Sequence, residues 1–113
     1  SGTGGLLIGL ARRRPDLSFL GIEPQRVYVV FAREEAARAG VTNVRFESGT
    51  MEELGTAAGG FRPDCVLTND VLHHVNDWDR GVLAVGAVAQ AQCWWLAIEP
   101  NSWNPYVLLG QTF

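Results

Sequence analysis

Two features near the start of the chain have the chemistry needed to bind a ribose-containing ligand. Residues 1–5 form a glycine-rich turn, SGTGG, directly before an apolar segment with helical spacing. Glycines allow a tight turn and leave backbone amides open to a ligand. Glu23 lies 19 residues after Gly4, at the end of a short apolar run, where a carboxylate accepts hydrogen bonds from ribose hydroxyls. The pair predicts a site for an adenosine-containing ligand without specifying which one.

A second group of polar residues follows the apolar run 65–69. It contains Asp70 and the adjacent histidines His73 and His74. An imidazole here is a candidate general base, with packing or capping as the alternative role. Because neighbouring positions point in different directions, we expect at most one histidine to face a ligand. Asp70 can face a cationic ligand group or cap the following turn. No third ligand stands at helical spacing, so we expect no metal site.

These residues need elements that bring them to one place, and the hydrophobic pattern predicts alternating helices and strands. Such an alternation implies right-handed crossovers and a parallel sheet with helices on both faces. Ligands then bind beyond the carboxyl ends of the strands, where residues 1–5, Glu23, 49–52 and 69–74 are expected. The predicted helices are 5–14, 26–39, 51–57 and 79–90, and the predicted strands are 17–22, 43–47, 65–69 and 94–98.

The helix predicted over 26–39 contains a conflict between local preferences. Residues 27–31, VYVVF, favour a strand by propensity alone. Residues 32–38, AREEAAR, strongly favour a helix, and no turn separates the two pieces. We therefore predict one helix, with Gly40 as the glycine that follows its last turn. At the start of the last helix, Asp77 is expected to complement the helix dipole.

Composition bounds the classes of protein that this chain can represent. Its 113 residues, 47% hydrophobic and 19% charged, describe one globular domain. A net charge of −3 argues against nucleic acid as the main partner. No apolar run reaches the roughly 18–20 residues that span a bilayer. Cys65 and Cys93 stand in no metal-binding or disulfide spacing. We expect a cytoplasmic enzyme, and the sequence leaves its oligomeric state open.

Four segments, taken in order along the chain, resemble the class I S-adenosylmethionine-dependent methyltransferases. They are SGTGGLLIGLARRRPDLSFLGIEP, NVRFESGTMEEL, FRPDCVLTNDVLHHVNDWDR and WWLAIEPN, and they are most similar to small-molecule enzymes of the ubiquinone/menaquinone methyltransferase type. The resemblance implies an α/β, Rossmann-like doubly wound sheet with five parallel strands present in the order 3-2-1-4-5. It also implies S-adenosylmethionine as cofactor and a small-molecule methyl acceptor. Against the family pattern, residues 1–113 are expected to be one methyltransferase domain truncated at both ends, without the C-terminal strands.

The resemblance also assigns roles to individual residues. Ser1, Gly2, Thr3 and Gly4 match the last four positions of the first cofactor loop, and Glu23, followed by Pro24, matches the ribose-binding acid. Thr50, Met51 and Glu52 match the segment that holds adenine, with Met51 offering an apolar face to the ring. Asn69 and Asp70 match the stretch that lines the methionine end of the cofactor, and His73 and His74 are the candidate catalytic bases.

Several departures from the family pattern keep alternatives open. Thr50 stands where an aspartate is usual, and a hydroxyl is a weaker acceptor for the adenine amine. Residues 91–93, AQC, replace a usual Pro-Gly-Gly turn. These features allow a catalytically silent methyltransferase-like fragment. A nicotinamide-dependent oxidoreductase is the other alternative, although Leu7 stands where its fingerprint requires a third glycine.

The segment after the last predicted strand is a candidate for contact with the acceptor. Glu99 and Asn101 are expected to reach it, and three residues that follow are expected to start a lid over it, with packing in the core or at an interface as the alternative for the two aromatic ones. The residues in question are Trp103, Asn104 and Tyr106.

Overall fold

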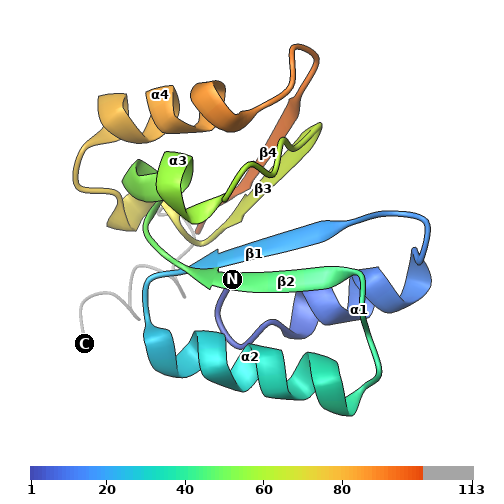
Figure 1. Ribbon diagram of the computed structural model, residues 1–113. Coiled ribbons are helices and arrows are strands. Elements are labelled where there is room, and N and C mark those ends of the chain that lie inside the picture. Colours follow the sequence, from blue (N-terminus) through green and yellow to red (C-terminus); the bar gives the residue numbers. More distant parts are fainter. Residues whose placement is uncertain (101–113) are drawn as a thin grey trace.

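The computed structural model describes residues 1–100, and helices and strands alternate along them (Figure 1). All eight predicted segments are confirmed, with ends that shift by no more than two residues. One short helical turn, η2, was not predicted. The elements are α1 (Gly5–Arg13), β1 (Phe19–Glu23), α2 (Arg26–Arg38), β2 (Val44–Ser48), η1 (Met51–Glu53), α3 (Leu54–Ala57), β3 (Cys65–Asn69), η2 (Leu72–His74), α4 (Trp78–Val88) and β4 (Trp94–Ile98).

The strands form two parallel pairs that point toward the same side of the molecule (Figure 1). In the first pair, β1 lies beside β2 with Glu23 opposite Ser48. In the second pair, β3 lies beside β4 with Asn69 opposite Ile98. Since the strands of each pair are parallel, their carboxyl ends share an edge, and the residues that follow them are neighbours.

The expected single sheet of five strands in the order 3-2-1-4-5 is wrong in its strand count. Residues 1–100 contain four strands in two separate sheets. In the expected order, β1, β2, β3 and β4 correspond to strands 2, 3, 4 and 5. Two of its neighbouring pairs are present, because strand 2 lies beside strand 3 and strand 4 lies beside strand 5. The first strand would lie between β1 and β3. Residues 1–4 form a turn and residues 5–13 a helix, so no described segment supplies that strand.

The N-terminal half has its own core, built where α1 and α2 pack against β1 and β2. Figure 1 shows both helices on the same side of this strand pair. On α2, Val29, Ala32 and Ala36 are buried, whereas Val27 and Val30 are exposed. Helical periodicity therefore prevails over the strand propensity of 27–31, because only a helix turns three separated small or branched residues toward Phe46.

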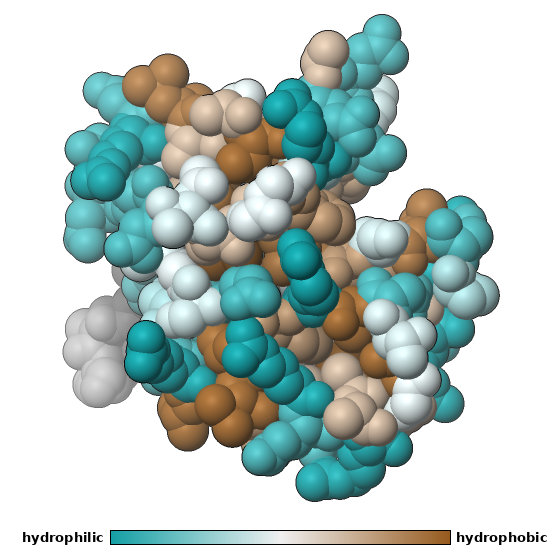
Figure 2. Space-filling view, in the orientation of Figure 1, coloured by the Kyte–Doolittle hydropathy of each residue, from teal (hydrophilic) through white to brown (hydrophobic). Residues whose placement is uncertain are grey.

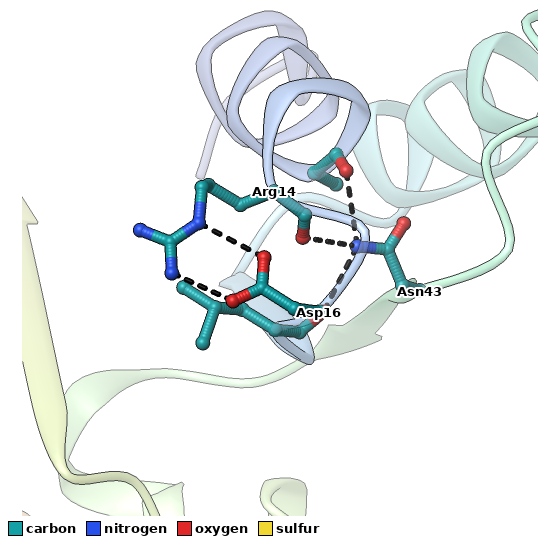
Figure 3. A network of polar contacts seen from close by, with 5 residues as sticks. Arg14, Asp16 and Asn43 are labelled. Atoms are coloured by element: carbon teal, nitrogen blue, oxygen red, sulfur yellow. Dashed lines mark hydrogen bonds and ion pairs between the residues drawn. The ribbon is translucent and has the colours of Figure 1, made fainter.

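A side-chain amide closes the junction between α1 and β1 (Figure 3). The Nδ2 group of Asn43 donates to the carbonyl oxygens of Ala11, Arg14 and Leu17 at 3.0, 3.0 and 2.9 Å. These carbonyls lie at the end of α1 and in the turn after it, where backbone acceptors have no helical partner. Nearby, the Arg14 guanidinium makes two hydrogen bonds to the carboxylate of Asp16. Asn43 thus fixes the path from the first helix into β1.

The C-terminal half is built from η1, α3 and α4 beside β3 and β4 (Figure 1). Asp77 confirms the predicted start of α4 and is its N-cap, accepting from the Arg80 amide at 3.0 Å. On β4, Trp94 is 77% exposed. Figure 2 also shows apolar side chains at the surface over the start of α2, where Val27 and Phe31 are exposed. None of the helices within residues 1–100 combines the length and apolarity that a bilayer crossing requires.

Candidate active site

The glycine-rich turn and the predicted ribose-binding acid lie in direct contact. The backbone amide of Gly2 donates to Glu23 Oε2 at 2.7 Å. The backbone nitrogen of Ser1 lies 3.1 Å from the same oxygen and 2.9 Å from the carbonyl oxygen of Ile22. The Gly4 amide closes the turn on the Ser1 carbonyl at 3.2 Å. Two features 19 residues apart in sequence therefore form one structural unit at the carboxyl end of β1.

Two glycines of this turn have left-handed backbone conformations. Gly4 has φ +81, and a Cβ built on it would lie 2.7 Å from Phe46 Cζ and 2.8 Å from Ala32 Cβ. Gly2 has φ +56, and a Cβ there would meet no atom within 4 Å. The turn thus packs tightly against the core at Gly4 and borders open space at Gly2, so a ligand can approach its backbone. Thr3 lies between the two glycines.

Glu23 is a buried carboxylate that the fold keeps ionised. Burial raises the pKa of Glu23, but hydrogen bonds from Gln25, Gly2 and Ser1 outweigh this effect and bring the pKa below its usual value. Its Oε1 atom accepts from the Gln25 amide at 3.1 Å. Within residues 1–100 this is the one hydrogen bond to Oε1, and a carboxylate oxygen can accept two. Oε1 can therefore accept a second hydrogen bond, and a ribose hydroxyl is a fitting donor for it. Pro24 follows as an exposed residue.

The segment predicted to hold adenine lies close to Glu23 and is tied to α4. The Gly49 amide donates to the Glu23 carbonyl at 3.1 Å. The side chain of Met51 is buried and reaches within 3.4 Å of a Cβ built on Gly81. Met51 thus packs against the start of α4 from inside the protein. Thr50 and Glu52 border an open groove of about 280 Å³, which is lined by Thr50, Glu52, Glu53, Asn76, Asp77 and Arg80.

Glu52 connects this segment to the loop before α4. Its Oε1 accepts from the amides of Asn76 and Asp77 at 3.2 and 3.4 Å. Hydrogen bonds from its own backbone amide, the Asp77 and Asn76 amides and the Thr50 side chain outweigh desolvation and lower the pKa of Glu52. One residue further on, the carboxylate of Glu53 accepts from the Thr50 amide at 2.9 Å. The two carboxylates and the Thr50 side chain are thus engaged in hydrogen bonds within the protein, and Thr50 and Glu52 border the groove.

The residues after β3 are organised by the carboxylate of Glu99, the residue that directly follows β4. Glu99 Oε1 accepts from the amides of Val71 and Leu72 at 3.0 and 2.8 Å. Glu99 Oε2 lies 2.7 Å from His73 Nδ1. The hydrogen bond from His73 is the main cause that lowers the pKa of Glu99 to about 2, aided by these two amides against the opposing effect of desolvation. Glu99, and not Asp70, is therefore the residue that caps η2.

Asp70 and the two histidines surround this cap. Asp70 has φ 58, and its amide donates to the Ile98 carbonyl at 2.7 Å, so the end of β3 is locked to β4 just after Asn69. Its Oδ1 lies 3.8 Å from His73 Nδ1. The rings of His73 and His74 have centroids 3.9 Å apart and are tilted by 44°. Of the sequence-predicted catalytic pair, only His73 has a hydrogen bond from its ring within the described residues.

A third potential metal ligand joins Asp70 and His73 through the tertiary structure. One ligand atom each from Asp70, His73 and Glu99 lie within 4.8 Å of one another. The expectation of no metal site considered only helical spacing along one segment, whereas Glu99 follows a different strand, β4. Spacing analysis could not find this cluster. The acceptor-contact residues Asn101, Trp103, Asn104 and Tyr106 lie outside the described residues.

Comparison with known proteins identifies the class to which this site belongs. Residues 1–93 match the profile of a family described as a methyltransferase domain. The chain therefore belongs to this methyltransferase-domain family, for which S-adenosylmethionine is the implied methyl donor. This membership confirms the class that the four sequence segments predicted.

Individual relatives support the same class. A solved structure, the YcgJ protein from Bacillus subtilis, superposes with a TM-score of 0.74 at 25% identity, covering 95% of this chain and 44% of that one. The tRNA (guanine-N(7)-)-methyltransferase of Halalkalibacterium halodurans is 37% identical over 54 residues, 48% of this chain and 24% of its own length. The enzyme of the same name from Streptococcus pneumoniae is 33% identical over 66 residues, 48% of this chain and 31% of its length. The chain thus spans less than half of each of these proteins.

Proposed function

We propose that this domain binds S-adenosylmethionine at the carboxyl ends of β1 to β4 and transfers its methyl group to a small-molecule acceptor. The observation that carries the proposal is the 2.7 Å hydrogen bond between the Gly2 amide and Glu23, in a chain of the methyltransferase family. It supports a cofactor site because it places the glycine turn, whose backbone borders open space at Gly2, directly beside a ribose acceptor. Leu7, where a nicotinamide fingerprint has glycine, disfavours the oxidoreductase alternative.

Each part of the proposed cofactor has a matching set of residues. The turn at Gly2 and Gly4 borders the cofactor, and Glu23 accepts from its ribose. The groove beside Thr50 receives the adenine, with a hydroxyl in place of the stronger carboxylate acceptor. The methionine end lies toward β3. In full, the proposed cofactor-binding residues are Ser1, Gly2, Thr3, Gly4, Glu23, Pro24, Thr50, Met51, Glu52, Asn69 and Asp70.

The residues of this chain have positioning as their main task. The bound cofactor supplies a methyl group on a positively charged sulfur, which is a very good leaving group. The protein then has to align the acceptor with the methyl carbon and exclude water. A base is needed only for an acceptor that must lose a proton, and His73 and His74 are the candidates for it.

We propose a small molecule as acceptor, of the kind used by ubiquinone/menaquinone methyltransferase-type enzymes. The net charge of −3 supports this choice, because binding a polyanion depends on neutralising its phosphates. Two of the relatives are named as tRNA methyltransferases, so the test must compare small molecules with tRNA as methyl acceptors.

Thermal unfolding with ligands tests the cofactor. The protein at its full natural length is heated with S-adenosylhomocysteine or NAD. A ligand at 100 times its Kd stabilises the folded state by about 2.7 kcal/mol, which raises the Tm by several degrees. We expect this with S-adenosylhomocysteine and no shift with NAD. The reverse pattern would refute the proposal, and transfer of labelled methyl groups to tRNA but to no small molecule would refute the acceptor.

A further inference from the structure

The contact between Glu99 and His73 joins two strand ends and involves a side chain that can carry a proton. Glu99 Oε2 lies 2.7 Å from His73 Nδ1, while Oε1 is already committed to the amides of Val71 and Leu72. The carboxylate is therefore held by backbone donors on one oxygen and presents the other to the imidazole. The contact is partly open to solvent, with the His73 side chain 40% exposed and that of Glu99 26% exposed. It is thus both fixed and accessible.

This geometry selects one tautomer of His73. An ionised carboxylate has only acceptors, so the hydrogen between the two groups must be on Nδ1. Glu99 is ionised at neutral pH because its pKa is about 2. A neutral imidazole with its hydrogen on Nδ1 has a lone pair on Nε2, which makes Nε2 a proton acceptor. His74 has no such partner within residues 1–100, so nothing there selects its tautomer.

We propose that Glu99 is a positioning residue that holds His73 with Nε2 free to take the proton of a hydroxyl acceptor during methyl transfer. This inference rests on the proposed methyltransferase function and narrows its substrate to compounds methylated at oxygen. As the acceptor oxygen bonds to the methyl carbon, the bond from that carbon to sulfur breaks. The O–H proton passes to His73 Nε2, so the products are the methyl ether, S-adenosylhomocysteine and an imidazolium paired with Glu99.

The charges around His73 suit this role. The imidazolium formed by proton transfer faces Glu99 at 2.7 Å and Asp70 Oδ1 at 3.8 Å. Two carboxylates at these distances stabilise a positive ring more than a neutral one. They favour the charge that appears as the acceptor oxygen loses its proton, so their effect is larger in the transition state than in the ground state.

The first experiment reads the tautomer directly and does not need an acceptor. In the Glu99→Gln variant, the amide oxygen keeps the bonds from Val71 and Leu72, and the NH₂ group faces His73 Nδ1. Nδ1 must then accept, so the ring hydrogen moves to Nε2. We expect nitrogen NMR of the neutral ring to show hydrogen on Nδ1 in the wild type and on Nε2 in the variant. The same tautomer in both proteins would overturn the inference.

The second experiment reads the chemistry, on full-length protein with a panel of phenols, aliphatic alcohols, amines and thiols. We expect methylation of hydroxyl compounds, with Glu99→Gln lowering kcat about 100-fold and changing KM less than about 3-fold. Methylation of thiophenol, which is already ionised at neutral pH, should fall far less. The matched control is Glu47→Gln, another carboxylate near a strand end, whose partner is Arg33 on α2. It should leave hydroxyl methylation within about 2-fold of the wild type.

The outcomes separate this inference from the proposed function. Binding of S-adenosylhomocysteine with methylation confined to amines and thiols, or with no acceptor in the panel methylated, would overturn the inference alone. Tight binding of one zinc or manganese ion that removes the Nδ1 hydrogen would also overturn it, because a metal at Asp70, His73 and Glu99 would occupy that nitrogen. Failure to bind S-adenosylhomocysteine would instead refute the proposed function.

Discussion

Each of the two strand pairs has, at its carboxyl end, a glutamate that accepts hydrogen bonds from backbone amides, and the surroundings of the two glutamates differ. In the first pair, the carboxylate of Glu23 accepts the amides of Gly2 and Gln25. In the second pair, the carboxylate of Glu99 accepts the amides of Val71 and Leu72. Glu23 is the last residue of β1 and Glu99 directly follows β4, and each binds a loop from elsewhere in the chain. They differ in that Glu23 is buried, whereas Glu99 is half-buried and also bonds a histidine.

This difference has a structural cause. The loop held by Glu23 also packs on the core, since Gly4 lies against Phe46 and Ala32. The loop held by Glu99 is a single helical turn with both histidines exposed. Packing therefore adds to hydrogen bonding in the first loop, and hydrogen bonding dominates in the second. The first arrangement suits a binding surface that must stay fixed, and the second suits a group that must exchange protons with a substrate.

The largest expected effect concerns the packed loop. Gly4→Ala should lower the free energy of unfolding by about 3 kcal/mol, because a left-handed alanine is strained and its Cβ overlaps Phe46 and Ala32. Urea unfolding measures the loss. The control is Gly9→Ala in α1, where a Cβ meets no atom within 4 Å and the substitution should stabilise by up to about 1 kcal/mol. Equal effects would show that the first loop is not held by the core.

Next in size is the effect of Glu23 on ligand binding. Glu23→Gln should weaken the binding of S-adenosylhomocysteine by about 2 kcal/mol, or about 30-fold in Kd, since charged hydrogen bonds contribute about 1.5–3 kcal/mol. Calorimetry measures the affinity, and Glu47→Gln on the neighbouring strand serves as the control. An unchanged Kd for Glu23→Gln would show that the loop held by Glu23 does not bind the ligand, and its contrast with the loop held by Glu99 would be wrong.

A smaller effect compares the helices that follow the two loops. Asp77 caps α4 by accepting from the Arg80 amide at 3.0 Å, whereas Gln25 at the start of α2 makes no side-chain cap. Asp77→Ala should cost about 1 kcal/mol in the free energy of unfolding, and Gln25→Ala close to nothing. Thermal or urea unfolding of the two variants gives the difference. A comparable loss of unfolding free energy in Asp77→Ala and Gln25→Ala would mean that side-chain capping does not distinguish α4 from α2.

The smallest effect is the pH dependence that Glu99 contributes. Its folded-state pKa of about 2 lies below the ordinary value of 4.5, so the ionised form stabilises the fold. That contribution is complete above about pH 4.5 and is lost as the pH falls toward about 2. We expect the urea midpoint of the wild type to fall more steeply over this interval than that of Glu99→Gln. Parallel curves for the two proteins would contradict the assignment.

Local sequence patterns predicted the first loop better than the second. The glycine turn and Glu23 were paired correctly because a strand and a helix of predictable length separate them. Capping of the turn after β3 was one of two roles predicted for Asp70, but the amides there donate to Glu99, which is 27 residues away from Leu72. The adjacent histidines also looked equivalent. Within residues 1–100, the contacts of His73 with Glu99 and Asp70 distinguish it from His74.

The order of helices and strands is a property of the sequence alone. Periodicity, glycines and prolines act over a few residues, which is why all eight segments appear where they were expected. The tertiary structure decided how the strands group into two sheets, that Met51 is buried against α4, and which carboxylate faces His73. These depend on contacts between residues far apart in the chain. Such contacts are set by how whole elements pack, and no local pattern contains that information.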